Sequence, residues 1–464
     1  MVRAPARRYG AHSMAPSRSP RSATRRAFPI LGLVAVATFS SMSMSPAPAP
    51  LRPVAPIVRP KPALVRTEPD IINVPAPVIS IPTISPIAIR PRQPDGPSAT
   101  TATRLALQSR LEGIREKYAI PGISVTILFP DGTTWVGSSG MADLAEKRPV
   151  TPDTAFAIAS VSKTFLAALI MALSEDGKLV LDAQVRTYLP GLRLDPKITV
   201  RQLLDHTSGL RDYFFHPMID KILLSHPDRR WDSLQSMRYV GKRYFKPGRG
   251  WHYSNTNYLI LGMLAERVTG KTLATLFHDR FFEPLGMRHT YYQPADTATG
   301  PVAHGYRFET AAIDSKPIDL SDGSGIVPFT SVVTAAAGAG AIASTSSDLA
   351  RWARALYAGD VLRERSVQEM VDDVARTERY RPTVPYGLGV QLVDVAGHQT
   401  LGHSGRLLGF RSVVRWLPEE HVSIAVLTNQ SRTDPAIIAR ALLKISLRSS
   451  EDGGVRRPPH AVGR

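Results

Sequence analysis

A serine and a lysine three positions apart are the residues whose types and spacing point most directly to chemistry. Ser160 and Lys163 lie in AFAIASVSKTFLAALIMAL, residues 155–173, where Lys163 is the one charged residue. On a helix this spacing places both side chains on one face. A lone ammonium in an apolar segment is costly unless it is paired or neutral. We therefore expect burial to lower the pKa of Lys163, so that its amine can take the Ser160 hydroxyl proton.

Two short motifs further along the chain could complete such a site. Tyr253-Ser254-Asn255 precedes a predicted helix, where the phenol can act as a base and the amide can bond substrate and lysine together. His403-Ser404-Gly405 enters the final predicted strands. We expect its glycine to let a substrate backbone approach closely and the strand edge to pair with an extended acyl group. Each motif alone is weak evidence, because similar tripeptides are common in turns and strands.

The elements that must position these residues follow from the hydrophobic pattern. Leu105, Leu111, Ile114 and Tyr118 recur at helical spacing and predict a first amphipathic helix. The other predicted elements are strands at 122–129 and 134–137, helices at 160–174, 257–269 and 347–357, strands at 386–395, 409–417 and 422–429, and a helix at 435–447. This order predicts an α+β fold, with an antiparallel sheet formed by both chain ends, flanking helices and an inserted helical region.

The order of the three motifs resembles a known family. Ser-x-x-Lys, Tyr-x-Asn and His-x-Gly begin at residues 160, 253 and 403. In this order they resemble the serine beta-lactamase and D-alanyl-D-alanine carboxypeptidase superfamily, in its class C-like branch. Further segments that resemble the family are 198–210 (ITVRQLLDHTSGL), 247–270, 283–287 (EPLGM) and 409–410. The resemblance covers roughly residues 106 to 447 and implies a beta-lactamase/transpeptidase-like fold.

The resemblance also implies roles for individual residues. Ser160 is then the nucleophile, and Lys163 and Tyr253 share the general-base and general-acid work. Asn255 positions the substrate amide. The oxyanion hole consists of the backbone N–H groups of Ser160 and Arg406.

His403-Ser404-Gly405 departs from the beta-lactamase pattern, which has Lys-Thr-Gly at this place. The His-x-Gly form is more typical of the carboxypeptidases and esterase-like members. We expect a protonated His403 to bind a substrate carboxylate as that lysine does. The alternative is a neutral hydrogen-bonding residue, with Arg406 or Arg411 holding the carboxylate. For the loop 206–209 (HTSG) we expect a structural hydrogen-bonding role.

Composition excludes several other functions. The chain has 464 residues and a formal net charge of +18, but residues 1–100 hold 13 Lys and Arg against 3 acids. The charge is therefore concentrated outside the predicted core, and no nucleic-acid-binding motif accompanies it. The chain has no cysteine, so disulfides and thiolate metal sites are excluded. No His-Glu-x-x-His cluster is present, and we expect no metal and no cofactor.

Four segments are predicted along the chain. Residues 1–45 form a basic targeting segment in which Arg25-Arg26, followed by a short apolar run, resembles a twin-arginine export signal. A disordered basic tail is the alternative. Residues 46–100 form a linker with 15 prolines between 46 and 97, which favours a stiff extended spacer. Residues 101–448 form the hydrolase domain, and 449–464 a disordered tail. We expect an exported protein in the periplasm, cell wall or outside the cell, or one anchored by the apolar run.

The leading functional hypothesis is a serine hydrolase that forms an acyl-enzyme on Ser160. Peptides ending in D-Ala-D-Ala are the first substrate class, so that a peptidoglycan-type peptide and the cell envelope are the expected partners. A small-ester hydrolase and a beta-lactamase are the alternatives within the family. A different class of function is a non-catalytic cell-surface binding protein on the same fold. The sequence leaves the oligomeric state open.

Overall fold

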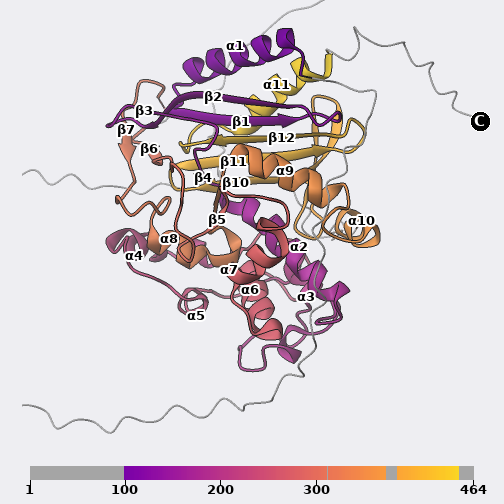
Figure 1. Cartoon of the computed structure of the whole chain (residues 1–464). Coiled ribbons are helices and arrows are strands. Elements are labelled where there is room, and N and C mark those ends of the chain that lie inside the picture. The colour runs from indigo at the N-terminus through magenta and orange to yellow at the C-terminus, as the bar shows by residue number, and fades with distance from the viewer. Residues whose placement is uncertain (1–98, 311, 373–383, 449–464) are drawn as a thin grey trace, which may run out of the picture. The chain divides into compact units, whose positions relative to one another are not determined.

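The computed structural model describes residues 99–448, except for residue 311 and residues 373–383. A seven-stranded antiparallel sheet lies at its centre, in the order β3-β2-β1-β12-β11-β10-β9 (Figure 1). The strands are β1 Gly122–Leu128, β2 Thr134–Asp143, β3 Arg148–Pro149, β9 Gln391–Val395, β10 His398–Leu407, β11 Phe410–Leu417 and β12 Val422–Thr428. Because β1 pairs with β12, the two ends of the domain close one sheet, which confirms the predicted fold class.

Two terminal helices, α1 (Thr101–Lys117) and α11 (Pro435–Arg448), pack against each other and over one face of the sheet (Figure 1). The buried stripe of α1 includes Leu107, Leu111 and Ile114, at the i, i+4, i+7 spacing of one helical face. Leu105 was expected on this face, but its side chain is 68% exposed. Two residues before Leu107 correspond to about 200° of rotation, so Leu105 points to the opposite side.

The inserted region is mainly helical and covers the other face of the sheet. Its helices and helical turns are η1 Ala159–Val161, α2 Ser162–Glu175, η2 Val185–Thr187, α3 Val200–Leu204, η3 Tyr213–Phe215, α4 Ile219–Ser225, α5 Ser233–Met237, α6 Asn255–Thr269, α7 Leu273–Phe277, η4 His278–Phe282, α8 Thr330–Ala336, η5 Ala337–Ala339, α9 Ser346–Tyr357 and α10 Glu364–Asp372. The short strands in it are β4 Phe156–Ala157, β5 Tyr291–Tyr292, β6 Tyr306–Phe308, β7 Pro317–Asp319 and β8 Ile342–Ser344.

Helices α2 and α9 join this region to the sheet. Every residue of α2 from Ser162 to Leu173 is buried, which explains why its sequence is apolar all round rather than on one stripe. Helix α9 contacts β1, β11 and β12. Its Trp352 stacks on Phe165 of α2, with ring centroids 4.0 Å apart. This contact ties the helix that follows Ser160 to the sheet.

Two predicted boundaries are wrong in ways that matter for the site. Ser160 does not begin an α-helix but lies in the 3-10 turn η1, with α2 starting at Ser162. The strand predicted from Tyr386 begins only at Gln391. The intervening Gly389 has a φ of 79°, and a Cβ there would lie 2.4 Å from the Cβ of Ala167. This tight turn against α2 cannot be part of a regular strand.

The targeting segment, the linker and the C-terminal tail lie outside the described residues, so those assignments stay predictions. Among the helices that the structure describes, none combines the length and the apolar character needed to cross a membrane.

Candidate active site

Ser160 occupies a constrained turn beside the sheet. The preceding Ala159 has a φ of 50°, in the left-handed region that costs free energy for a residue with a Cβ. Strand β10 packs directly against this turn. From β11, the Ser412 hydroxyl donates to the Ile158 carbonyl at 2.7 Å. The turn is thus held from the sheet side, and Ser160 itself remains half-buried.

Lys163 lies fully buried in the first turn of α2. Its Nζ contacts three oxygens: Ser160 Oγ at 3.1 Å, Asn255 Oδ1 at 2.7 Å and the Ala339 carbonyl at 2.7 Å. Burial lowers the pKa of Lys163 to about 7, although the nearby Asp212 carboxylate acts in the opposite direction. The sequence expectation of a depressed lysine pKa is therefore met, and a substantial fraction of the amine is neutral near pH 7.

The three contacts also determine where the lysine lone pair points. The Asn255 amide oxygen and the Ala339 carbonyl can only accept hydrogen bonds, so each takes one N–H of a neutral amine. A neutral amine has two N–H groups, and its lone pair then faces the third contact, Ser160 Oγ. A hydroxyl can donate as well as accept. Loss of one proton from Lys163 thus converts this contact from a donor into a base for Ser160.

Asp212 is a site residue that the sequence analysis missed. Its Oδ2 accepts from Asn255 Nδ2 at 2.7 Å, and its Oδ1 accepts from the Phe214 backbone N–H at 3.0 Å. Since an ionised carboxylate only accepts hydrogen bonds, it turns the NH2 of Asn255 toward itself and the amide oxygen toward Lys163. Burial raises the pKa of Asp212, while these hydrogen bonds and Lys163 act against the rise.

Tyr253 lies next to Lys163, with Lys163 Nζ 5.1 Å from the centre of its ring. The residue as a whole is half-buried, and its sequestered Oη interacts with the Ser160 hydroxyl. Burial raises the pKa of Tyr253 above the usual value, and the Ser160 hydroxyl offsets part of this rise. Tyr253 is therefore a neutral phenol at rest. This state suits Tyr253 to donate a proton rather than to accept one, whereas the lowered pKa of Lys163 suits the lysine to accept one.

The surroundings of His403 disfavour the charge that was expected of it. It is buried, and burial, Lys163 and Arg415 lower its pKa to about 3, while its bond to the Ser404 carbonyl acts in the other direction. A second cation next to Lys163 in a dry site would be strongly unfavourable. The buried position of His403 and its lowered pKa therefore favour the alternative, a neutral hydrogen-bonding residue, over an imidazolium that binds a carboxylate.

Gly405 has a different use from the one expected. A Cβ at this position would lie 2.2 Å from the Ile158 carbonyl oxygen and 2.3 Å from Ser412 Oγ. The space that a side chain would fill thus belongs to the turn that precedes Ser160, rather than to a substrate backbone. The glycine is needed so that β10 can approach this turn.

Ser404 and Arg406 flank this glycine on β10. The Ser404 N–H and hydroxyl both bond to the Gln391 side chain, at 3.0 and 3.3 Å, and the sequence analysis did not name Gln391. The side chain of Arg406 is exposed. Its backbone N–H as an oxyanion donor, like the substrate-binding roles of Asn255 and Ser404, stays a prediction.

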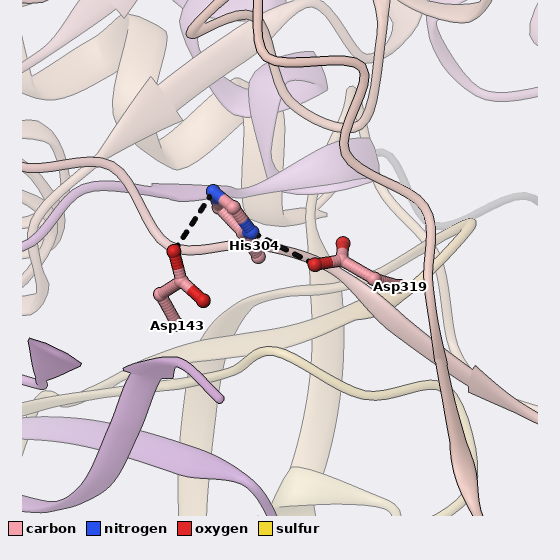
Figure 2. Close-up of side chains that lie close together, drawn as sticks. All are labelled: Asp143, His304 and Asp319. Atoms are coloured by element: carbon pink, nitrogen blue, oxygen red, sulfur yellow. Dashed lines mark hydrogen bonds and ion pairs between the residues drawn. The ribbon is translucent and has the colours of Figure 1, made fainter. Parts of the chain in front are cut away.

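A second cluster of titratable groups includes Asp143, His304 and Asp319, whose possible ligand atoms lie within 4.8 Å of one another (Figure 2). His304 Nε2 is 3.5 Å from Asp143, and its Nδ1 is 2.9 Å from Asp319. Both ring nitrogens thus face carboxylates, and Arg148 lies 3.8 Å from Asp143 Oδ2. Since Asp143 Oδ1 also accepts two backbone N–H groups, the cluster is better explained as an ion-pair network between β2 and β7 than as a metal site.

Comparisons with known proteins agree with this geometry. A penicillin-binding protein of Bacillus subtilis is 29% identical over 335 residues, which are 70% of this chain and 72% of that protein. A D-aminopeptidase of Cereibacter sphaeroides is 29% identical over 359 residues, 76% of this chain but only 64% of the aminopeptidase. The crystal structure of a D-amino acid amidase from Ochrobactrum anthropi SV3, complexed with L-phenylalanine amide, matches with a TM-score of 0.64 and 27% identity, over 76% of this chain and 99% of that one.

The family model described as Beta-lactamase matches residues 107–447, which contain all the site residues described above. The matched range also coincides with the sheet and both of its covering layers. The chain therefore belongs to the beta-lactamase family.

Proposed function

We propose that the protein is a serine hydrolase that forms an acyl-enzyme on Ser160. One observation carries this proposal: the buried Lys163 amine, with its pKa lowered to about 7, lies 3.1 Å from Ser160 Oγ. A neutral amine in this position can activate a hydroxyl at physiological pH. A lysine with a purely structural role would not need a third contact with the half-buried Ser160 hydroxyl in addition to its two carbonyl acceptors.

The proposed reaction has two acyl-transfer steps. Ser160 Oγ attacks the substrate carbonyl carbon, and its proton passes to Lys163 Nζ. When the carbon–nitrogen or carbon–oxygen bond of the substrate breaks, the leaving group takes a proton from the Tyr253 phenol, and the Lys163 ammonium returns a proton to the Tyr253 phenolate; alternatively, Lys163 protonates the leaving group directly. On either route Lys163 is neutral again when the leaving group departs. Water then attacks the acyl-enzyme, and Lys163 takes one of the water protons. The bond between the acyl carbon and Ser160 Oγ then breaks, Ser160 Oγ takes the proton back from Lys163, and the free acid leaves.

We propose amides of D-configured residues as the substrate class. Peptides ending in D-Ala-D-Ala are the members expected from the sequence. The names of the D-aminopeptidase and D-amino acid amidase relatives support the same stereochemistry. At 29% and 27% identity these names do not transfer a single substrate to this chain. Small esters are the second candidate, because an ester needs less leaving-group protonation than an amide does.

A turnover panel tests the substrate class. Purified protein is assayed with D-alanyl and L-alanyl p-nitroanilide, with an acyl-D-Ala-D-Ala peptide, with p-nitrophenyl acetate and with nitrocefin. The proposal predicts at least about tenfold higher kcat/KM for the D-amide than for its L-partner. Equal rates for both enantiomers would remove the stereochemical proposal, and turnover of the ester alone would favour the esterase alternative.

The binding-protein alternative makes a different prediction. A non-catalytic member of the fold would bind a fluorescent penicillin reversibly, if at all, and would turn over none of the panel. Covalent labelling that survives denaturation, together with turnover, excludes this alternative.

Export is a separate proposal, which rests on Arg25-Arg26 in the sequence. We expect the protein outside the cytoplasm of its host. Replacing both arginines with lysine should retain it inside, as judged by cell fractionation. Unchanged export of that variant would contradict the twin-arginine assignment and leave the hydrolase assignment intact.

A further inference from the structure

Tyr386 is a buried tyrosine that the proposed reaction does not use. It lies before β9, and its hydroxyl joins two buried histidines. Tyr386 Oη is 2.9 Å from His403 Nε2 and 3.3 Å from His206 Nε2. The three side chains are at most 2% exposed. They lie behind Tyr253, whose ring centre is 4.4 Å from that of His206 and 6.3 Å from that of His403.

The directions of the hydrogen bonds at the His206 end can be derived first. The Leu210 backbone N–H donates to Ser208 Oγ. The Ser208 hydroxyl donates to Asn257 Oδ1 at 2.7 Å, so the amide NH2 of Asn257 faces His206 Nδ1 at 3.0 Å. The Ser254 backbone N–H also points at this nitrogen, at 3.3 Å. His206 Nδ1 therefore accepts, and the single proton of the neutral ring is on Nε2.

The remaining directions follow one after another. His206 Nε2–H donates to Tyr386 Oη. Because the Ser404 carbonyl beside His403 Nδ1 can only accept, the neutral His403 ring carries its proton on Nδ1, and the Tyr386 phenol donates to His403 Nε2. This Nδ1–H donates to the Ser404 carbonyl at 2.6 Å. With both rings neutral, this arrangement satisfies the hydrogen bonds that join His206, Tyr386, His403 and the Ser404 carbonyl.

The surroundings keep this arrangement neutral. The titratable or charged groups that act on the three rings are Lys163, His252, Tyr253, Tyr258, Tyr357 and Arg415, and Asp205 acts on the neighbouring Tyr258. Burial, then Lys163, lowers the pKa of both histidines, and burial raises that of Tyr386. Protonation of His206 would place its Nδ1–H against two donors, the Asn257 NH2 and the Ser254 backbone N–H. The bond directions are therefore stable around neutral pH.

We propose that Tyr386 is a positioning residue that fixes His403 as its Nδ1–H tautomer and so holds the Ser404 carbonyl and strand β10 in place beside Ser160. This inference rests on the proposed function, because it concerns the geometry of the same site. Tyr386 acts through His403 and touches no reacting atom.

A change of the His403 tautomer would affect Ser160 because β10 is closely packed against the turn that precedes this serine. In the other tautomer, the bare His403 Nδ1 would face the Ser404 carbonyl oxygen across 2.6 Å, and two acceptors at that distance repel each other. The peptide that follows leads into Gly405, which is packed against the turn before Ser160. A shift of Ser404 is therefore transmitted to the nucleophile and to the predicted oxyanion donor at Arg406. Small displacements of such groups reduce the chemical step more than binding.

The test compares Tyr386→Phe with Tyr357→Phe. Both variants remove one buried phenol oxygen, but Tyr357 Oη has no hydrogen-bond partner among the described residues. The full chain is labelled with 15N-histidine, and the His403 ring signals are identified by their loss in His403→Gln. We expect a pure Nδ1–H pattern in the wild type and in Tyr357→Phe, and a mixed or Nε2–H pattern in Tyr386→Phe.

Kinetics supply the second readout. We expect kcat of Tyr386→Phe to fall about tenfold or more, with KM changed less than about threefold. The double variant Tyr386→Phe/His403→Gln should be no slower than His403→Gln, because both substitutions break one chain of contacts. An unchanged His403 pattern in Tyr386→Phe, or a kcat equal to that of Tyr357→Phe, overturns the proposal.

The two proposals fail in different ways. If the wild type has no turnover and no covalent label on Ser160, the proposed function is wrong, and the ring signals still decide the tautomer. If the wild type is active and Tyr386→Phe keeps both the tautomer and the rate, only the positioning role is wrong.

Discussion

Two buried hydrogen-bonded chains meet at Tyr253, and they differ in charge. The ionic chain consists of Lys163, Asn255 and Asp212, joined by bonds of 2.7 Å. The neutral chain consists of His206, Tyr386 and His403, joined by bonds of 3.3 and 2.9 Å. The ionic chain ends in a carboxylate, which can only accept. The neutral chain contains only groups that can both donate and accept.

The difference shows that burial alone does not make a catalytic base. Burial is the largest cause of the lowered pKa in both Lys163 and His403. The lysine starts from a high value and has Asp212 nearby, so its pKa stops at about 7. Within the part of the chain that the structure describes, no carboxylate offsets the burial of the histidine, and its pKa falls to about 3. One chain can therefore exchange a proton at neutral pH, while the other serves as a fixed scaffold.

The largest expected effect comes from removing Ser160 Oγ, the hydroxyl oxygen that Lys163 of the ionic chain contacts. Ser160→Ala should lower kcat by at least about a thousandfold, because no other hydroxyl contacts Lys163 Nζ in the described chain. The melting temperature should change by only a few degrees, since the lysine keeps two acceptors. Ser174→Ala, at the far end of α2, is the control. Residual activity above a few per cent would contradict the nucleophile assignment.

Tyr253, at the junction of the two chains, should give the next largest effect. Tyr253→Phe removes the proposed proton donor, and we expect kcat for an amide to fall about 100-fold or more. An activated ester should lose less, because its leaving group departs without a proton. Comparing the two substrates in this variant measures the leaving-group role. Equal losses for amide and ester would assign Tyr253 to another step.

Asp212→Asn breaks the ionic chain at its anionic end. The Asp212 charge raises the pKa of Lys163, so its removal should lower that pKa below about 7. The base form then exists at lower pH, and the acidic limb of the kcat/KM profile should shift to lower pH. We also expect a roughly tenfold loss in kcat, since Asn255 loses its fixed orientation.

Asp348→Asn is a matched control for this prediction. Asp348 is also buried with a raised pKa, and its partners are His289 and Thr290. The Asp348→Asn variant should lower the free energy of unfolding without shifting the pH profile of kcat/KM. A limb that stays in place in Asp212→Asn would mean that Asp212 does not act on Lys163.

The smallest expected effect is that of His403 protonation on the pH profile of activity. With a His403 pKa of about 3, no limb from this residue should appear between pH 5 and pH 9. An acyl-D-Ala-D-Ala peptide and a neutral ester should show profiles of the same shape, in the wild type and in His403→Gln. If kcat/KM for the carboxylate-bearing peptide fell as pH rises through about 6.5, and kcat/KM for the ester did not, His403 would have the charged role after all.

The sequence predicted the parts of the site that local pattern determines. The isolated Lys163 in an apolar helix, the order of the three motifs and the sheet closed by both chain ends were all visible in it. Asp212 and Tyr386 were missed, because their roles depend on contacts with residues 43 and 17 positions away, respectively. The sequence could not decide between the charged and the neutral role of His403 for the same reason, since burial and Lys163 lower its pKa.

The central claim is that Lys163 activates Ser160 as a neutral base, and the pH dependence of Ser160 acylation tests it most directly. The full-length protein is mixed with a fluorophosphonate between pH 5 and pH 9, and adduct formation is followed by intact mass, with peptide mapping of the site. The account predicts one adduct, on Ser160, at a rate that rises through about pH 7, the pKa of Lys163. An adduct on another residue, or a Ser160 rate that does not change with pH, would contradict it.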